Sequence, residues 1–121
     1  MRKILLLCLP LAALLLCGRP VAAATACPAT GTCACTVGTG ATTCLAAKTA
    51  APYRDVVIQN LSASATIACT DDGSTPAIGA AGSWTIAPGT TSQWASSNVA
   101  FTGPFICIAS AAATPVTVKG Q

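Results

Sequence analysis

Cysteine is the residue type that most constrains how this chain can fold, because eight of its 121 residues are cysteines. Two of them, Cys8 and Cys17, lie in an amino-terminal segment that has the features of an export signal. Removal of residues 1–24 would leave 97 residues (121 − 24) with six cysteines, which is an even number. Short exported chains with this cysteine content form disulfide frameworks. The candidates for pairing are Cys27, Cys33, Cys35, Cys44, Cys69 and Cys107.

Six cysteines allow 15 pairings, and their spacing narrows the choice only in part. Cys69 and Cys107 each lie in an apolar segment typical of a strand, and a bridge between them would close a loop of about 38 residues. The chain-entropy model assigns about 4 kcal/mol to such a loop. Cys33 and Cys35 are too close in sequence to pair with each other without strain. We therefore expect two local bridges, each using one of that close pair, among Cys27, Cys33, Cys35 and Cys44. A zinc site made of these four is the alternative, but the C-x2-C spacing of zinc sites is absent.

Residues 1–24 predict a cleaved signal peptide. Arg2 and Lys3 precede a 13-residue apolar run, Ile4–Leu16, and small residues lead up to Ala24. The apolar run is shorter than the roughly 20 residues that span a bilayer. We therefore expect a secreted or periplasmic protein, with no membrane contact after signal removal. Lipidation at Cys27 is an alternative, but it would leave an odd number of cysteines for disulfides.

The charges that remain after residue 24 cancel. Three basic residues stand against three aspartates, at positions 48, 54 and 119 and at positions 55, 71 and 72. A neutral chain is poorly suited to nucleic acid or to an anionic membrane surface. The chain contains no His and no Glu, which removes the commonest general base and many metal ligands. We therefore expect no enzyme activity and no cofactor. Asp71-Asp72-Gly73 is typical of a turn, because it lacks the alternating spacing of a calcium loop.

The composition predicts an all-β fold, because Val, Ile and Thr make up 29 of the last 97 residues. Ala, Thr and Ser together supply 46 of them (21, 17 and 8), so we expect a thin core supported by disulfides. The prediction is a small antiparallel β-sandwich or barrel of seven to nine short strands over 35–121, with a cysteine-rich extended arm over 25–34. The expected strands are 35–39, 42–46, 55–61, 65–70, 83–87, 91–95, 98–101, 105–110 and 114–119.

Three segments carry a resemblance: YRDVVIQNLSASATIACT (53–70), GSTPAIGAAGSWTIAPG (73–89) and PFICIASAAATPVTV (104–118). Together they resemble small β-sandwich proteins that bacteriophages and prophages encode as accessory virion or tail proteins. The shared outline is an arginine before an apolar strand ending in Gln-Asn, a Ser-rich turn, a Gly-Ser strand with a Pro-Gly turn, and a late strand ending in Thr-Pro-Val-Thr-Val. The resemblance implies a β-sandwich and a structural role. The signal peptide and the cysteine-rich arm are features that this group lacks.

Trp84 and Trp94 are the candidate binding residues. They flank Pro88-Gly89 at similar distances, so in a hairpin they would lie nearly opposite one another as a cross-strand pair. As buried residues they would be the largest core side chains; as exposed residues they would form a platform for a sugar or a protein. Two hypotheses follow: a structural or surface-decoration protein that assembles on itself or on a larger scaffold, and a secreted module that binds a glycan or protein partner. Asn60-Leu61-Ser62 also matches a glycosylation sequon, which matters only in a eukaryotic host.

Overall fold

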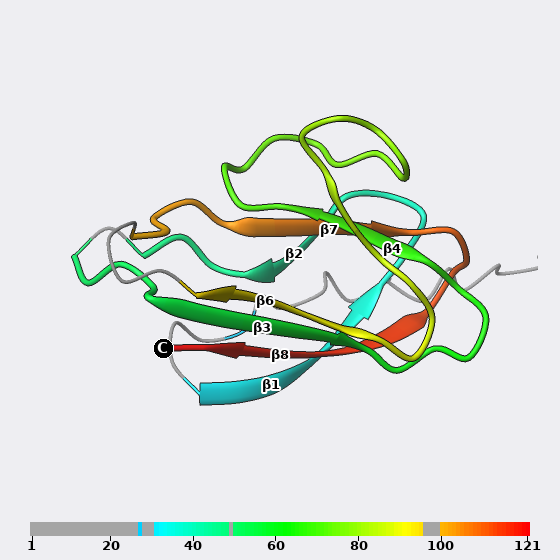
Figure 1. The fold of residues 1–121 in the computed structure, drawn as a ribbon, viewed down its shortest axis with the longest axis horizontal. Coiled ribbons are helices and arrows are strands. Elements are labelled where there is room, and N and C mark those ends of the chain that lie inside the picture. The colour runs from blue at the N-terminus through cyan, green and yellow to red at the C-terminus, as the bar shows by residue number, and fades with distance from the viewer. Residues whose placement is uncertain (1–26, 28–30, 49, 96–99) are drawn as a thin grey trace, which may run out of the picture.

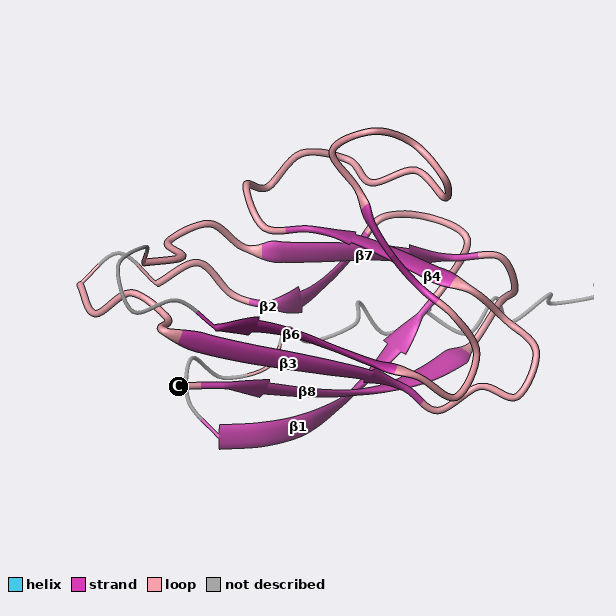
Figure 2. Cartoon of the chain, viewed as in Figure 1, coloured by secondary structure: helices cyan, strands magenta, loops and turns pink. Residues whose placement is uncertain are grey.

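The structure is a computed structural model that describes residues 27, 31–48, 50–95 and 100–121. These residues form strands and loops without a helix, as Figures 1 and 2 show, so the all-β expectation is confirmed. No helix in the described ranges could therefore cross a lipid bilayer. The eight strands are β1 (Gly31–Val37), β2 (Thr42–Leu45), β3 (Asp55–Asn60), β4 (Ile67–Thr70), β5 (Trp84–Ile86), β6 (Thr91–Ala95), β7 (Phe105–Ala109) and β8 (Thr114–Gly120).

The strands form two four-stranded sheets, with orders β1-β8-β3-β6 and β2-β7-β4-β5, and every strand pairing is antiparallel. The two sheets lie one above the other in Figure 1. First pairs with last, second with seventh, third with sixth and fourth with fifth, as if one long hairpin were rolled into two layers. This connectivity is the eight-stranded jelly roll. Of the two expected architectures, the sandwich is therefore the observed one.

The core lies between the sheets and follows the period-two alternation of the strands. In β3, Val56 and Ile58 are fully buried whereas Gln59 is exposed, and β7 and β8 alternate in the same way. Many of the buried apolar residues are cysteines and alanines, so the core is thin. It is built around one group of larger residues. That group comprises Val37, Leu45, Tyr53, Val56, Ile58, Ile67, Ile86, Trp94, Phe105, Val116 and Val118.

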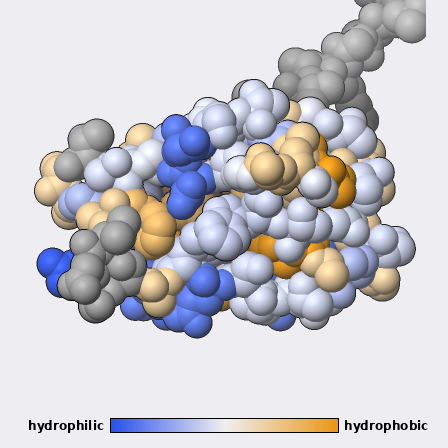
Figure 3. All heavy atoms as spheres, turned by 45° about the horizontal axis from the view of Figure 1, so that its top comes forward, coloured by the Kyte–Doolittle hydropathy of each residue, from blue (hydrophilic) through white to orange (hydrophobic). Residues whose placement is uncertain are grey.

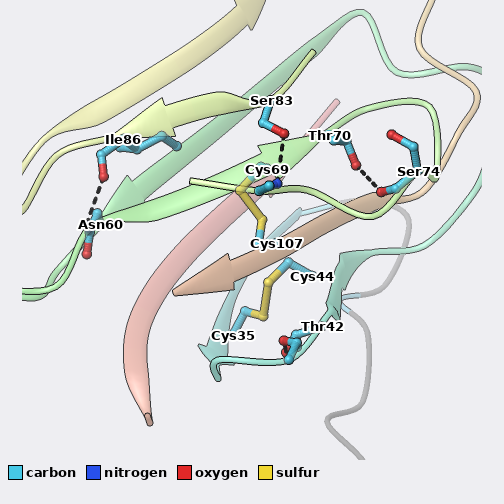
Figure 4. Close-up of a disulfide and its surroundings, with 12 residues drawn as sticks. Cys35, Thr42, Cys44, Asn60, Cys69, Thr70, Ser74, Ser83, Ile86 and Cys107 are labelled. Carbon is cyan, nitrogen blue, oxygen red and sulfur yellow. Dashed lines mark hydrogen bonds between the residues drawn. A yellow bond between two sulfur atoms is a disulfide. The ribbon is translucent and has the colours of Figure 1, made fainter. Parts of the chain in front are cut away.

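All three disulfides agree with the expected pattern. Cys69 and Cys107 are direct neighbours in the β4–β7 register, with their Cα atoms 4.1 Å apart. The two local bridges are Cys27–Cys33 and Cys35–Cys44, so each uses one member of the close pair. Figure 4 shows the Cys35–Cys44 and Cys69–Cys107 bridges. These bonds leave no cysteine ligand for the zinc alternative and occupy the Cys27 sulfur that lipidation would need. They also indicate an oxidising extracellular or periplasmic environment.

The sandwich begins earlier in the chain than expected. Residues 31–34 belong to β1, which pairs with β8 along its whole length, so the sandwich begins before the boundary expected between residues 34 and 35. Residues 31–34 pair one by one with residues 120–117 of β8, which extends the strand before its expected start at residue 35. Residues 1–24 lie outside the described residues. The expected strand over 98–101 lies mostly outside them too, and Phe101 forms an isolated bridge with Tyr53.

The prediction of a hairpin around Pro88-Gly89 is wrong, because the flanking strands do not pair with each other. β5 pairs with β4 in one sheet, and β6 pairs with β3 in the other, so the Pro88-Gly89 turn carries the chain from sheet to sheet. Both strands are edge strands. Trp84 and Trp94 nevertheless meet across the gap between the sheets, with ring centroids 5.8 Å apart in an edge-to-face arrangement.

Candidate functional site

The candidate site is an open pocket of about 410 Å³ beside Trp84 at the start of β5. It is lined by Asp71, Asp72, Gly82, Ser83 and Trp84. The volume lies in the range of small-molecule sites. Trp84 is 53% exposed, the highest value among the exposed large apolar side chains of the described residues. The pocket thus combines an aromatic surface, two carboxyl groups and a hydroxyl group.

The register of two strands brings these residues together. Trp84 pairs with Cys69, so the residues just after β4 and just before β5 lie at the same end of the sheet. The connection between them runs from Asp71 to Ser83 and rises above the sheet in Figure 1. A loop with ends this close is an Ω-type loop. Asp71 and Asp72 come from its first end, and Ser83 comes from its last end.

Hydrogen bonds within the loop fix both ends. Thr70 Oγ1 donates to the carbonyl oxygen of Ser74 at 2.5 Å, and the Ser74 amide donates to Asp72 Oδ1 at 2.9 Å. At the other end the Ala77 amide donates to Ser83 Oγ at 3.0 Å. Figure 4 shows Thr70, Ser74 and Ser83 close to the Cys69–Cys107 bridge. The site is therefore anchored to a disulfide-linked pair of strands.

The loop before β7 supports the two aspartates from outside. A Cβ atom added to Gly103 would lie 2.5 Å from the carbonyl oxygen of Asp71 and 3.1 Å from Cα of Asp72. Only a glycine allows two backbone segments to approach this closely. Pro104 lies close to Gly73: a Cβ atom added to Gly73 would lie 3.3 Å from Cγ and Cδ of Pro104. The backbone that carries both carboxyl groups is thus held in place by a neighbouring loop.

Hydrogen bonds from Ser74 lower the pKa of Asp72 below its usual value, so this carboxyl group is ionised at neutral pH. The causes of the shift are these hydrogen bonds and a smaller one from its own backbone, not a neighbouring cation. Asp72 is exposed, and its Oδ1 already accepts the Ser74 amide, so Oδ2 is the oxygen that a ligand could use.

Trp84 rests on an aromatic series that continues into the core. Its ring packs edge-to-face against the Trp94 ring. The ring centroids of Trp94 and Phe105 are in turn 5.5 Å apart. Phe105 in turn contacts Tyr53 and Phe101, so the series includes all five aromatic residues of the chain. Trp94 is 6% exposed, and its indole nitrogen has no hydrogen-bond partner among the described residues. The two tryptophans therefore divide the roles that the sequence left open: Trp94 is a core residue and Trp84 is a surface residue.

The aspartates were also candidates from the sequence, and the structure places them differently. Asp71-Asp72-Gly73 forms the expected turn, with Gly73 at a φ of 81°, but its contribution to a pocket with Trp84 was missed. Asp55 accepts a hydrogen bond from Gln93 Nε2 at 3.0 Å. Within the described ranges, no group of three or more metal-ligating side chains is assembled.

A glycan on Asn60 would be incompatible with the folded chain. The Asn60 side chain is fully buried, and its Nδ2 donates to the carbonyl oxygens of Ala65, Ile86 and Ala87. Its Oδ1 accepts from the Ser62 amide at 3.1 Å. Figure 4 shows the bond between Asn60 and Ile86. This amide therefore links the β3–β4 turn to the crossing between β5 and β6.

Comparison of the chain with protein-family models, with curated proteins and with solved structures gives no match. The functional argument therefore depends on the chemistry of the pocket, because a jelly-roll topology alone supports many functions.

Proposed function

We propose that this chain is an exported, non-enzymatic binding module that holds a saccharide in the pocket beside Trp84. The observation that carries the proposal is the exposed Trp84 ring on a pocket that also contains Asp71, Asp72 and Ser83. An indole face packs against the apolar C–H face of a sugar ring. Carboxylate and hydroxyl oxygens at the rim accept hydrogen bonds from sugar hydroxyl groups.

The placement of Trp84 supports a binding role over a packing role. The chain has only five aromatic residues, and burial of a large apolar side chain contributes about 1.5–3 kcal/mol. Trp84 leaves half of its surface in water, in a molecule whose core is otherwise thin. The contact with buried Trp94 holds its ring in one orientation, which reduces the entropy lost when a ligand binds.

Export is part of the proposal. Three disulfides support a folded state in an oxidising compartment. The apolar run of residues 4–16 supports the cleaved signal peptide that would direct the chain there.

The test uses the secreted protein and a panel of soluble oligosaccharides, with tryptophan fluorescence and titration calorimetry as readouts. We expect one class of sugar to bind and Trp84→Ala to weaken its affinity at least about tenfold, as for an aromatic hot spot. Ile78→Ala is the matched control, because Ile78 is 41% exposed on the same loop but does not line the pocket. Binding that is unchanged in Trp84→Ala would place the sugar elsewhere and overturn the proposal.

A surface-decoration role is the second candidate, and the outer face of β1-β8-β3-β6 favours it. The outward positions of these strands are mostly small or uncharged, and include Thr32, Ala34, Thr36, Thr117, Gln59 and Thr91. Figure 3 views the molecule from the side of the other sheet, and the surface visible there is also mostly of intermediate hydropathy, with strongly hydrophilic residues at a few separate places. The outer face of β1-β8-β3-β6 therefore suits contact with a second copy or with a scaffold, and the structural role that the phage resemblance implies is consistent with it. Size-exclusion chromatography with light scattering tests it: we expect assemblies larger than the monomer, and Thr117→Lys should dissociate them.

A further inference from the structure

We propose that the ligand of the Trp84 pocket carries a positive charge beside an apolar face, as an amino sugar does. This inference rests on the proposed binding function and names the class of ligand. The described residues that line the pocket include two carboxyl groups and no basic side chain. The hydroxyl groups of a neutral sugar would donate ordinary hydrogen bonds to these carboxyl groups, whereas an ammonium group would donate charge-assisted ones, which are stronger.

The three basic residues in the described part of the chain do not line the pocket. Lys48 Nζ lies 5.1 Å from the centre of the Tyr53 ring. Lys119 lies in β8, opposite Val57 and Thr32, in the other sheet. Arg54 directly precedes β3, in the same sheet as β8. The pocket is therefore a negative region on a chain whose charges after residue 24 sum to zero.

The pocket places an indole ring beside two carboxyl groups, and both kinds of group attract an ammonium group. A cation is attracted to the face of an indole more than to other aromatic rings. Carboxylates accept the N–H donors of the same group in charge-assisted hydrogen bonds. The close approach of Gly103 restrains the backbone of both aspartates, and the Ser74 amide holds the Asp72 carboxylate, so that acceptor is in place before the ligand arrives. Trp84 would stack on the apolar face of the sugar ring of the ligand, and the aspartates would bind its ammonium group.

The experiment compares ligands that differ in one substituent. β-1,4-linked tetramers of glucosamine and of N-acetylglucosamine carry an ammonium and a neutral acetamide, respectively, on the same ring. Choline supplies the positive charge without a sugar. We expect the glucosamine tetramer to bind at least about tenfold more tightly than its acetylated form, in the range of a hydrogen bond to a charged group. Added salt should weaken its binding, because exposed charges are screened.

Variants of the chain locate the effect. Asp71→Asn and Asp72→Asn should each weaken glucosamine binding about fivefold or more and leave the acetylated form little changed. Asp55→Asn is the matched control, because it removes the same charge from β3, outside the pocket. An equal loss in Asp55→Asn would show long-range attraction only and would overturn the inference.

The outcomes separate this inference from the proposed function. Equal or tighter binding of the acetylated tetramer, dependent on Trp84, would overturn the charge preference and leave the saccharide module standing. Trp84-dependent binding of choline without binding of either sugar would support the positive charge and overturn the saccharide. Absence of binding by all three ligands, with another sugar of the oligosaccharide panel bound through Trp84, would overturn this inference and leave the proposed function standing. Absence of binding by the whole panel as well would overturn both.

Discussion

Asn60 is the residue whose polar side chain joins the most separate parts of the fold. Its amide group donates to three carbonyl oxygens on two crossings and accepts from one amide. Asn60→Ala would leave these groups without their partner in a buried place, so we expect a loss of about 2–4 kcal/mol in the free energy of unfolding. Urea denaturation measures it. Gln59→Ala, at an exposed position of the same strand, should change stability by less than about 0.5 kcal/mol, and a similar loss in both variants would contradict this role.

Gly103 is the residue that sets the position of the site. Because its added Cβ would lie 2.5 Å from a backbone oxygen, Gly103→Ala forces the Asp71–Asp72 segment to move. We expect a loss of about 1–3 kcal/mol, as for other overpacked positions, together with shifted amide resonances around Asp71 in NMR spectra. Gly40→Ala is the control, since no atom lies within 4 Å of its added Cβ and its φ is ordinary. Unshifted Asp71 resonances in Gly103→Ala would show that the two loops are independent.

At the scale of the element, the sequence predicted where strands lie better than how they pair. Runs of β-branched residues between turn signals located β2, β3, β6, β7 and β8 to within about a residue at each end. Pro88-Gly89 has the residues of a tight turn, but whether it closes a hairpin or crosses between sheets depends on which distant strands accept β5 and β6. The pocket depends on the same information, because the Cys69–Trp84 pairing brings Asp71 close to Trp84. No local pattern encodes that pairing.

The β4–β7 pair is the element whose cross-link spans the longest loop. Its bridge joins residues 38 positions apart, whereas the two local bridges span six and nine. Loop-closure entropy gives about 4 kcal/mol for the long loop and about 2–3 kcal/mol for each short one. We therefore expect the double variant Cys69→Ala, Cys107→Ala to lose more stability in urea than Cys27→Ala, Cys33→Ala. The reverse order would show that packing around β1 outweighs loop length.

For the whole molecule, stability should be nearly constant between pH 5 and 8, because the chain has no His. Burial raises the pKa of Tyr53 above its ordinary value of 10.0, so its stabilising effect is present below that pH and is lost as the pH rises through the folded value. The lowered pKa of Asp72 acts in the opposite range: its contribution is present above about pH 4 and is lost as the pH falls further. Melting temperatures from pH 3 to 11 measure this profile, and Tyr53→Phe should flatten its alkaline end. A steep change near pH 6.5 would contradict it.

The three disulfides should supply most of the net stability of the whole molecule. Leu, Ile, Val and Phe make up only 16 of the 97 residues after position 24, so burial at about 25 cal/mol per Å² exceeds the chain entropy by little. Bridges worth about 2–4 kcal/mol each are comparable to the whole stability of a small domain, about 5–15 kcal/mol. The Cys35–Cys44 bridge also joins the two layers, because it links β1 of one sheet to β2 of the other, whereas Cys69–Cys107 fixes two neighbours within a sheet. Reduction therefore removes both the tie between the sheets and the constraint on the unfolded chain. We expect a reductant to lower the melting temperature by tens of degrees (about 4–8 °C per kcal/mol for a domain of this size) in circular dichroism. A reduced chain that melts with the oxidised one would show that the small side chains pack densely enough to hold the jelly roll without covalent help.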